Sequence, residues 1–244
     1  MTLSSDTVTG PAARPGPAPG PDALKDGQAP VTVPASRQAP ASRRPAMRIG
    51  ARVFTGVAAL VMLAGLAAPL WHYDFLAPQY PEGLSLSIWA YKLGGRFDLV
   101  NELNHYVGME VIDEAAFPEF RVIPAALVLL ALWGMMVAAR GGVAALEGWL
   151  AAFALAGFAA LGDFWLWLYR YGHDLNPRAP IRIAPFTPRL LGSYSLMNFS
   201  ISGYPGLGAS ALFAAFLLGA AALVLQARAR PGATAHWRRP HFAA

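Results

Sequence analysis

The residues best suited to chemistry lie in one short polar stretch, residues 97–109, which reads FDLVNELNHYVGM. Its apolar residues recur at helical spacing, and Gly108 is placed to end a helix. On this helix Glu102, Asn104 and His105 are expected on the polar side, and Met109 follows His105 by four residues. A carboxylate, an imidazole and a thioether would then share one edge. Imidazole with thioether is a ligand set that suits copper, particularly Cu(I).

Two more histidines, His72 and His173, border the apolar segments on the same side of the membrane as this stretch. They could join His105 and Met109 in a copper site. Apart from His105 and Met109, no two of these residues are close enough in the sequence to form a metal-binding motif. A separate hydrogen-bonding role for each imidazole is therefore the alternative. The absence of cysteine excludes disulfides, iron–sulfur clusters and cysteine zinc sites.

Other chemistries find less support. Glu102 and His105 form a single E-x-x-H, whereas di-iron bundles need that motif on two helices and further glutamates. No histidine lies inside an apolar segment, which argues against a membrane haem. Asp163 is the acid that lies well inside an apolar segment, residues 146–169. We expect it to pair with Arg170 or with an outer-loop arginine rather than to form part of a proton pathway. The sequence contains no nucleophile elbow, P-loop or zincin motif that would indicate an enzyme.

The composition is that of an integral membrane protein. The chain has 244 residues, of which 55% are hydrophobic and 14% charged, and its mean hydropathy is +0.39. Four apolar segments are about as long as a membrane-crossing helix, roughly 20 residues: 53–71, 122–139, 146–169 and 207–226. We therefore predict an all-α protein with four transmembrane helices, and a small periplasmic cap built from two long outer loops, residues 72–121 and 170–206.

Arginines set the expected orientation. They precede the first segment, separate the second from the third at Arg140, and follow the fourth, so the positive-inside rule places both termini in the cytoplasm of a bacterial inner membrane. This placement also explains the net charge of +5 without nucleic acid as a partner. The lipid bilayer is the expected partner. We predict a disordered Pro/Ala-rich tail in residues 1–47, the membrane domain in residues 48–227 and a short basic tail in residues 228–244.

The two outer loops differ in charge. The first carries eight acids against three bases, and the second carries four arginines against one acid, so we expect them to dock on each other. In the first loop Pro78 and Pro81 are expected to keep the chain irregular, before residues 84–89 alternate like a strand. Asp113 is placed to cap a short turn. In the second loop four prolines exclude a regular helix before Leu190.

Several of these runs resemble one family. They are LAPQYPEGLSLSIWAYKLGG, LNHYVGM, YGHDLNPRAPIRI and LMNF, within residues 70–205. They are similar to an uncharacterised bacterial membrane-protein family that is associated with gene clusters for nitrous-oxide reductase and its maturation. The motif positions here are Tyr80, Pro81, Gly83, Trp89, Leu93, Gly94, Gly95, Asn104, His105, Tyr106, Gly108, Met109, Gly172, His173, Asn176 and Pro177. The proline-rich tail departs from the pattern.

The resemblance implies a role near copper delivery, assembly or electron supply to a periplasmic copper enzyme. The leading hypothesis is thus a non-enzymatic membrane accessory protein of periplasmic respiratory metabolism, with copper held at the cap. One alternative is a structural subunit whose cap docks a partner complex. Another is a quinol-reactive subunit that uses Asp163, His173 and the aromatic residues 165–171 near the outer interface.

Overall fold

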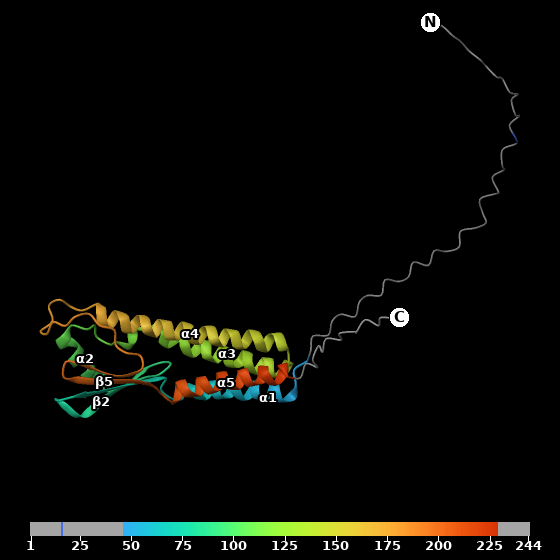
Figure 1. Cartoon of the computed structure of the whole chain (residues 1–244), viewed down its shortest axis with the longest axis horizontal. Coiled ribbons are helices and arrows are strands. Elements are labelled where there is room, and N and C mark those ends of the chain that lie inside the picture. The colour runs from blue at the N-terminus through green and yellow to red at the C-terminus, as the bar shows by residue number, and fades with distance from the viewer. Residues whose placement is uncertain (1–15, 17–45, 229–244) are drawn as a thin grey trace, which may run out of the picture. The chain divides into compact units, whose positions relative to one another are not determined.

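The computed structural model describes residue 16 and residues 46–228. Most of the predicted tail 1–47, and the tail 228–244 beyond Arg228, lie outside the described residues. In the described part the elements run α1 (Ile49–Gly65), β1 (Trp71–Ala77), β2 (Tyr80–Ile88), β3 (Leu93–Gly95), α2 (Phe97–Val107), a 3-10 helix (Glu114–Ala116), α3 (Glu119–Arg140), α4 (Val143–His173), β4 (Gly192–Leu196), β5 (Phe199–Pro205) and α5 (Leu207–Ala227) (Figure 1).

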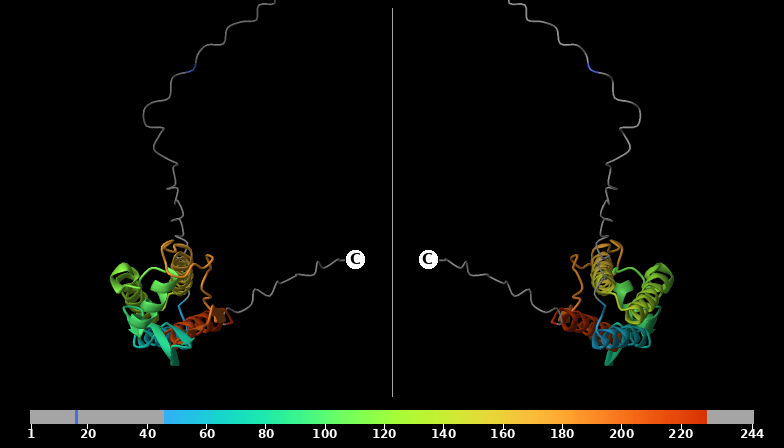
Figure 2. Two further views of the ribbon diagram at one scale, coloured as in Figure 1. Left: turned by 90° about the vertical axis from the view of Figure 1, so that its left-hand side faces the viewer. Right: turned by 90° about the vertical axis from the view of Figure 1, so that its right-hand side faces the viewer.

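Three helices, α3, α4 and α5, are long and apolar enough to cross a membrane, which is consistent with a membrane protein. The first predicted span does not run to Trp71. Helix α1 has 17 residues and ends at Gly65, and the chain passes through Pro69 into a strand that begins at Trp71. Helix α1 nevertheless lies alongside α5 and α3 (Figures 1 and 2).

The expected all-α fold is wrong, because the two outer segments form a five-stranded antiparallel sheet in the order β3-β2-β1-β5-β4. The strand-like alternation predicted for residues 84–89 is confirmed in β2, where Leu84 and Leu86 are buried and Ser85 is exposed. Residues 72–83 are not irregular. Most of them belong to the β1–β2 hairpin, and Pro81 is tolerated as an exposed residue close to its turn.

The two outer segments do contact each other as predicted, but the cause of the contact differs from the predicted one. Strand β1 from the first segment pairs with β5 from the second, with Asp74 opposite Ser202. Among the described residues the single ion pair joins Arg96 to Asp98, and both belong to the first segment. Backbone hydrogen bonds between strands, rather than opposite charge, therefore join the two segments.

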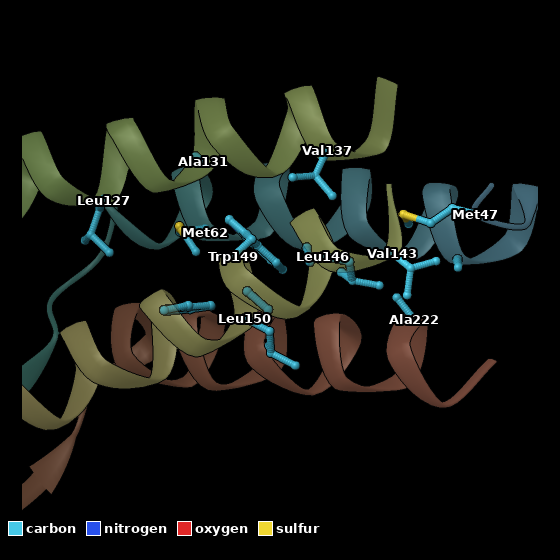
Figure 3. Close-up of a cluster of buried hydrophobic side chains, with 14 of the residues drawn as sticks. Met47, Met62, Leu127, Ala131, Val137, Val143, Leu146, Trp149, Leu150 and Ala222 are labelled. Carbon is cyan, nitrogen blue, oxygen red and sulfur yellow. The ribbon is translucent and has the colours of Figure 1, made fainter. Parts of the chain in front are cut away.

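Helices α3, α4 and α5 pack closely around Trp149, which is fully buried (Figure 3). Its indole Nε1 donates to the Leu130 carbonyl oxygen at 2.8 Å, and its ring lies against Gly134 of α3 and Gly219 of α5. These contacts hold the first half of α4 against its neighbours. The second half of α4 continues beyond the start of α5 and covers the sheet (Figure 1), where Phe164 and Leu168 pack with Trp71 and Tyr73.

Candidate functional site: a cavity between the sheet and the helices

The three outer histidines have separate surroundings. The Nδ1 atom of His72 lies 3.1 Å from the Ser87 hydroxyl, and the ring stacks on Tyr204. His173 stacks on Tyr169, one turn earlier on α4, with ring centroids 3.8 Å apart. His105 is exposed on α2. Within residue 16 and residues 46–228, no group of three or more His, Asp or Glu side chains is placed to hold a metal ion.

Helix α2 forms as expected but does not present the expected edge. It ends at Val107, and Gly108 adopts a left-handed conformation with φ 80°, which confirms the predicted stop. Met109 lies beyond the helix and lines a cavity, whereas Glu102 and His105 are exposed to solvent. Asn104 was expected on the polar side. It is 7% exposed, because it shares the buried face with Val100 and Val107 at helical spacing.

The predicted partner of Asp163 is not observed. In the part of the chain that the structure describes, Asp163 forms no ion pair with Arg170 or any other base. The guanidinium of Arg170 is exposed and lies 5.4 Å from the centroid of the Trp167 ring. Asp163 instead faces the same cavity as Met109. It is twenty residues from the start of α4, or roughly 30 Å along the helix, which is about the thickness of the hydrocarbon core.

That cavity has a volume of about 620 Å³ and lies between the inner face of the sheet and helices α2, α3, α4 and α5. It extends from Tyr73 and Ile201 on the sheet to Phe153 on α4 and Phe216 on α5. Its size falls in the range of small-molecule sites. The walls are almost entirely aliphatic and aromatic, so the cavity suits an apolar occupant.

The cavity also reaches the outside of the helix bundle. Phe158 on α4 and Phe213 on α5 both line it, yet they are 75% and 64% exposed. Both lie within the helices that are apolar enough to cross a membrane. Gly157 on α4 lines the cavity as well, and a Cβ atom there would meet nothing within 4 Å. The opening therefore lies between α4 and α5, on a surface that lipid would cover.

Several polar side chains in the lining already have partners. Trp71 Nε1 donates to the Leu190 carbonyl, Tyr73 donates to the Arg189 carbonyl at 3.0 Å, and Tyr171 donates to the Val111 carbonyl. Burial raises the pKa of the Tyr73 hydroxyl above its ordinary value, with nearby Tyr194 as a second cause. Burial likewise raises the pKa of Tyr194 to about 12. These phenols remain neutral at physiological pH.

Two buried polar atoms in the lining have no partner. Within the described ranges, Asn104 Nδ2 and Glu119 Oε2 are the buried side-chain nitrogen and oxygen atoms that form no hydrogen bond. An unpaired buried polar group costs free energy, so such atoms call for an explanation. Both residues line the cavity, near its sheet end: Asn104 lies on α2, and Glu119 is the first residue of α3. Both atoms are fully buried, so a bound molecule would supply the missing partners once a neighbouring side chain moves and opens them to the cavity.

Glu119 was not among the site residues predicted from the sequence. It was counted only among the acids of the first outer segment, although it lies three residues before the apolar segment 122–139. That position places a carboxylate at a helix N-terminus, where the helix dipole favours it.

Comparison of the chain with known proteins identifies no relative, because no family model and no curated protein matches it.

Proposed function

We propose that this chain is a membrane protein that binds a neutral, long-chain lipophilic molecule in the cavity between its sheet and its helices. The observation that carries the proposal is an apolar cavity of about 620 Å³ whose opening lies between two helices apolar enough to contact lipid. A molecule dissolved in the bilayer could enter sideways without crossing water. The cavity then places one end of that molecule under the sheet.

The proposal includes an orientation. Arg48, Arg52, Arg140 and Arg228 lie at the end of the helix bundle away from the sheet, and the positive-inside rule puts that end in the cytoplasm. The sheet would then face the periplasm of a bacterial inner membrane. In that position the protein would hold a membrane-derived molecule at the outer surface of the bilayer, within reach of periplasmic respiratory proteins.

The test uses a pair of glycines on α4. Gly157 lines the cavity, whereas Gly162 does not, and a Cβ atom at either position would meet nothing within 4 Å. We expect squalene, an oxygen-free polyisoprene, to raise the melting temperature of the full chain in detergent, because a ligand that binds only the folded state stabilises it. Gly157→Phe should abolish that shift, and Gly162→Phe should keep it.

Two outcomes would refute the proposal: no shift in the unaltered chain, or an equal shift in both variants. Both variants add the same side chain to the same helix. Their comparison therefore separates occupation of the cavity from a general effect of a bulky residue in lipid.

A role that involves copper stays a prediction, drawn from the histidine and methionine residues of the outer segments and from the resemblance. It can be tested by measuring the copper bound to the purified chain and to the double variant His105→Ala, Met109→Leu. Equal and negligible copper in both would end it. The cavity proposal does not depend on that result.

A further inference from the structure

The unpaired atoms in the cavity indicate which end of a ligand lies under the sheet. Asn104 Nδ2 is a hydrogen-bond donor and lies on α2, above the helix bundle. Glu119 Oε2 lies at the first residue of α3. The opposite end of the cavity, around Phe153, Leu212 and Phe216, is entirely hydrocarbon. The cavity therefore has one polar end and one apolar end, and it matches a molecule with a small polar head and a long apolar tail.

The charge of the lining excludes an anionic head. Glu119 and Asp163 both line the cavity, and no Lys, Arg or His does so among the described residues. A fatty acid or a phospholipid phosphate would place a third negative group beside these two acids, in an apolar environment where like charges repel strongly. A cationic ammonium head is excluded on a different ground, because it has no lone pair with which to accept a hydrogen bond from Asn104 Nδ2. The head is therefore neutral.

The hydrogen-bonding capacity of the two atoms narrows the class further. The indole Nε1 of Trp167 donates to Glu119 Oε1 at 3.3 Å, so Glu119 already acts as an acceptor. As a carboxylate its second oxygen offers only lone pairs, whereas the amide nitrogen of Asn104 offers only hydrogens. A head that satisfies both atoms must donate one hydrogen bond and accept another. A hydroxyl group does both.

Aromatic rings surround this end of the cavity. Phe117 lies 4.6 Å from Trp167 and 5.4 Å from Phe120, measured between ring centroids, and all three line the cavity. Aromatic rings pack well edge-to-face and offset against one another. The surroundings of Glu119 therefore favour a planar, hydroxyl-bearing ring over an aliphatic alcohol.

We infer that the sheet end of the cavity binds the hydroxyl-bearing ring of a prenylated hydroquinone, with Asn104 Nδ2 as donor to it and Glu119 Oε2 as acceptor from it. This inference rests on the proposed function, because the tail must occupy the apolar end. It adds the chemical class of the head and a preference for its reduced form. Every oxygen of an oxidised quinone is an acceptor without a hydrogen, so the quinone can accept from Asn104 but cannot donate to Glu119.

The experiment measures the binding of decylubiquinol, kept reduced without oxygen, and of decylubiquinone to the full chain in detergent. We expect the reduced form to bind more tightly. Asn104→Leu, which keeps the volume but removes the donor, should weaken binding of decylubiquinol roughly ten-fold, as expected for an unpaired hydrogen-bonding group. Glu119→Gln should remove the preference for the reduced form, because its amide can donate to a carbonyl. Glu102→Gln, on the exposed face of α2, should change neither affinity.

Squalene and hexadecanol complete the design. Squalene should shift the melting temperature of Asn104→Leu and Glu119→Gln as it does that of the unaltered chain, which also shows that both variants fold. The inference is overturned if decylubiquinol binds all variants equally, or if hexadecanol binds as tightly and with the same dependence on Asn104. Failure of squalene to bind the unaltered chain would count against the proposed function instead.

Discussion

Trp167 and Glu119 join α4 to α3 at the sheet end of the cavity, where the indole Nε1 donates to the carboxylate Oε1 across 3.3 Å. The bond occupies one oxygen of Glu119 and leaves the other, Oε2, buried beside the cavity without a partner. It also links the covering half of α4 to the first residue of α3. The position of the unpaired oxygen thus depends on a side chain from another helix.

Replacing that indole should weaken binding without emptying the cavity. Trp167→Phe keeps an aromatic ring but loses the hydrogen bond, whose net contribution is about 1 kcal/mol, so decylubiquinol should bind about five-fold more weakly. Squalene should bind as before. Trp165→Phe is the matched control, because Trp165 is 51% exposed and does not line the cavity. An equal loss in both variants would mean that the Glu119 contact has no part in binding.

The packing around Trp149 predicts a different kind of effect. A Cβ atom added at Gly134 would lie 2.9 Å from Trp149 Cε2, closer than a well-packed interior allows. Gly134→Ala should lower the free energy of unfolding by about 1–3 kcal/mol, measured by denaturation in detergent. At Gly148 the nearest atom would be 3.9 Å away, so Gly148→Ala should leave stability unchanged or raise it through helix propensity. Equal stability of the two variants would contradict this view of the core.

The elements that the sequence predicted best are those whose signal is local. Long apolar runs predicted the helices α3, α4 and α5. Gly108 predicted the end of α2, because a residue in the left-handed conformation terminates a helix. Asp113 caps the 3-10 helix as expected, since its side chain accepts from the Ala115 amide. Each of these features depends on a few neighbouring residues.

The sheet could not be predicted in the same way, because its central pairing joins β1 to β5, more than a hundred residues later in the chain. Opposite charge suggested that these segments meet, but it carries no information about strand register. The cavity was equally hidden. Its unpaired atoms come from Asn104 and Glu119, and only their position after folding distinguishes them from other polar residues near a membrane.

The β1–β5 pairing can be tested directly, since the chain contains no cysteine. Leu76 lies opposite Ser200 in this pair, and both side chains are exposed. Facing residues of antiparallel strands have Cα atoms about 4.5–5.5 Å apart, within the range of a disulfide. The double variant Leu76→Cys, Ser200→Cys should therefore cross-link on mild oxidation, seen as a mobility change that a reductant reverses.

A second cysteine pair provides the control for this cross-link. Ser195 lies opposite Ser200 on the far side, in β4, so it is two strands from Leu76, or about 10 Å. Leu76→Cys with Ser195→Cys should not cross-link. If this pair reacts as fast as the first, the strand order is different.

The buried Tyr194 predicts how stability depends on alkaline pH. Burial raises its pKa to about 12 in the folded chain, whereas an unfolded tyrosine releases its proton near pH 10. Between these values the unfolded state loses the proton and the folded state keeps it, so the free energy of unfolding should fall as pH rises. Below about pH 10 both states are protonated, and the full stability is present.

Tyr194→Phe should therefore flatten the decline of the free energy of unfolding between about pH 10 and 12, measured by denaturation at several pH values. The same two proteins compared near pH 8 report the packing effect of the hydroxyl alone. Parallel curves over the whole range would show that Tyr194 ionises as readily in the folded chain as in the unfolded one.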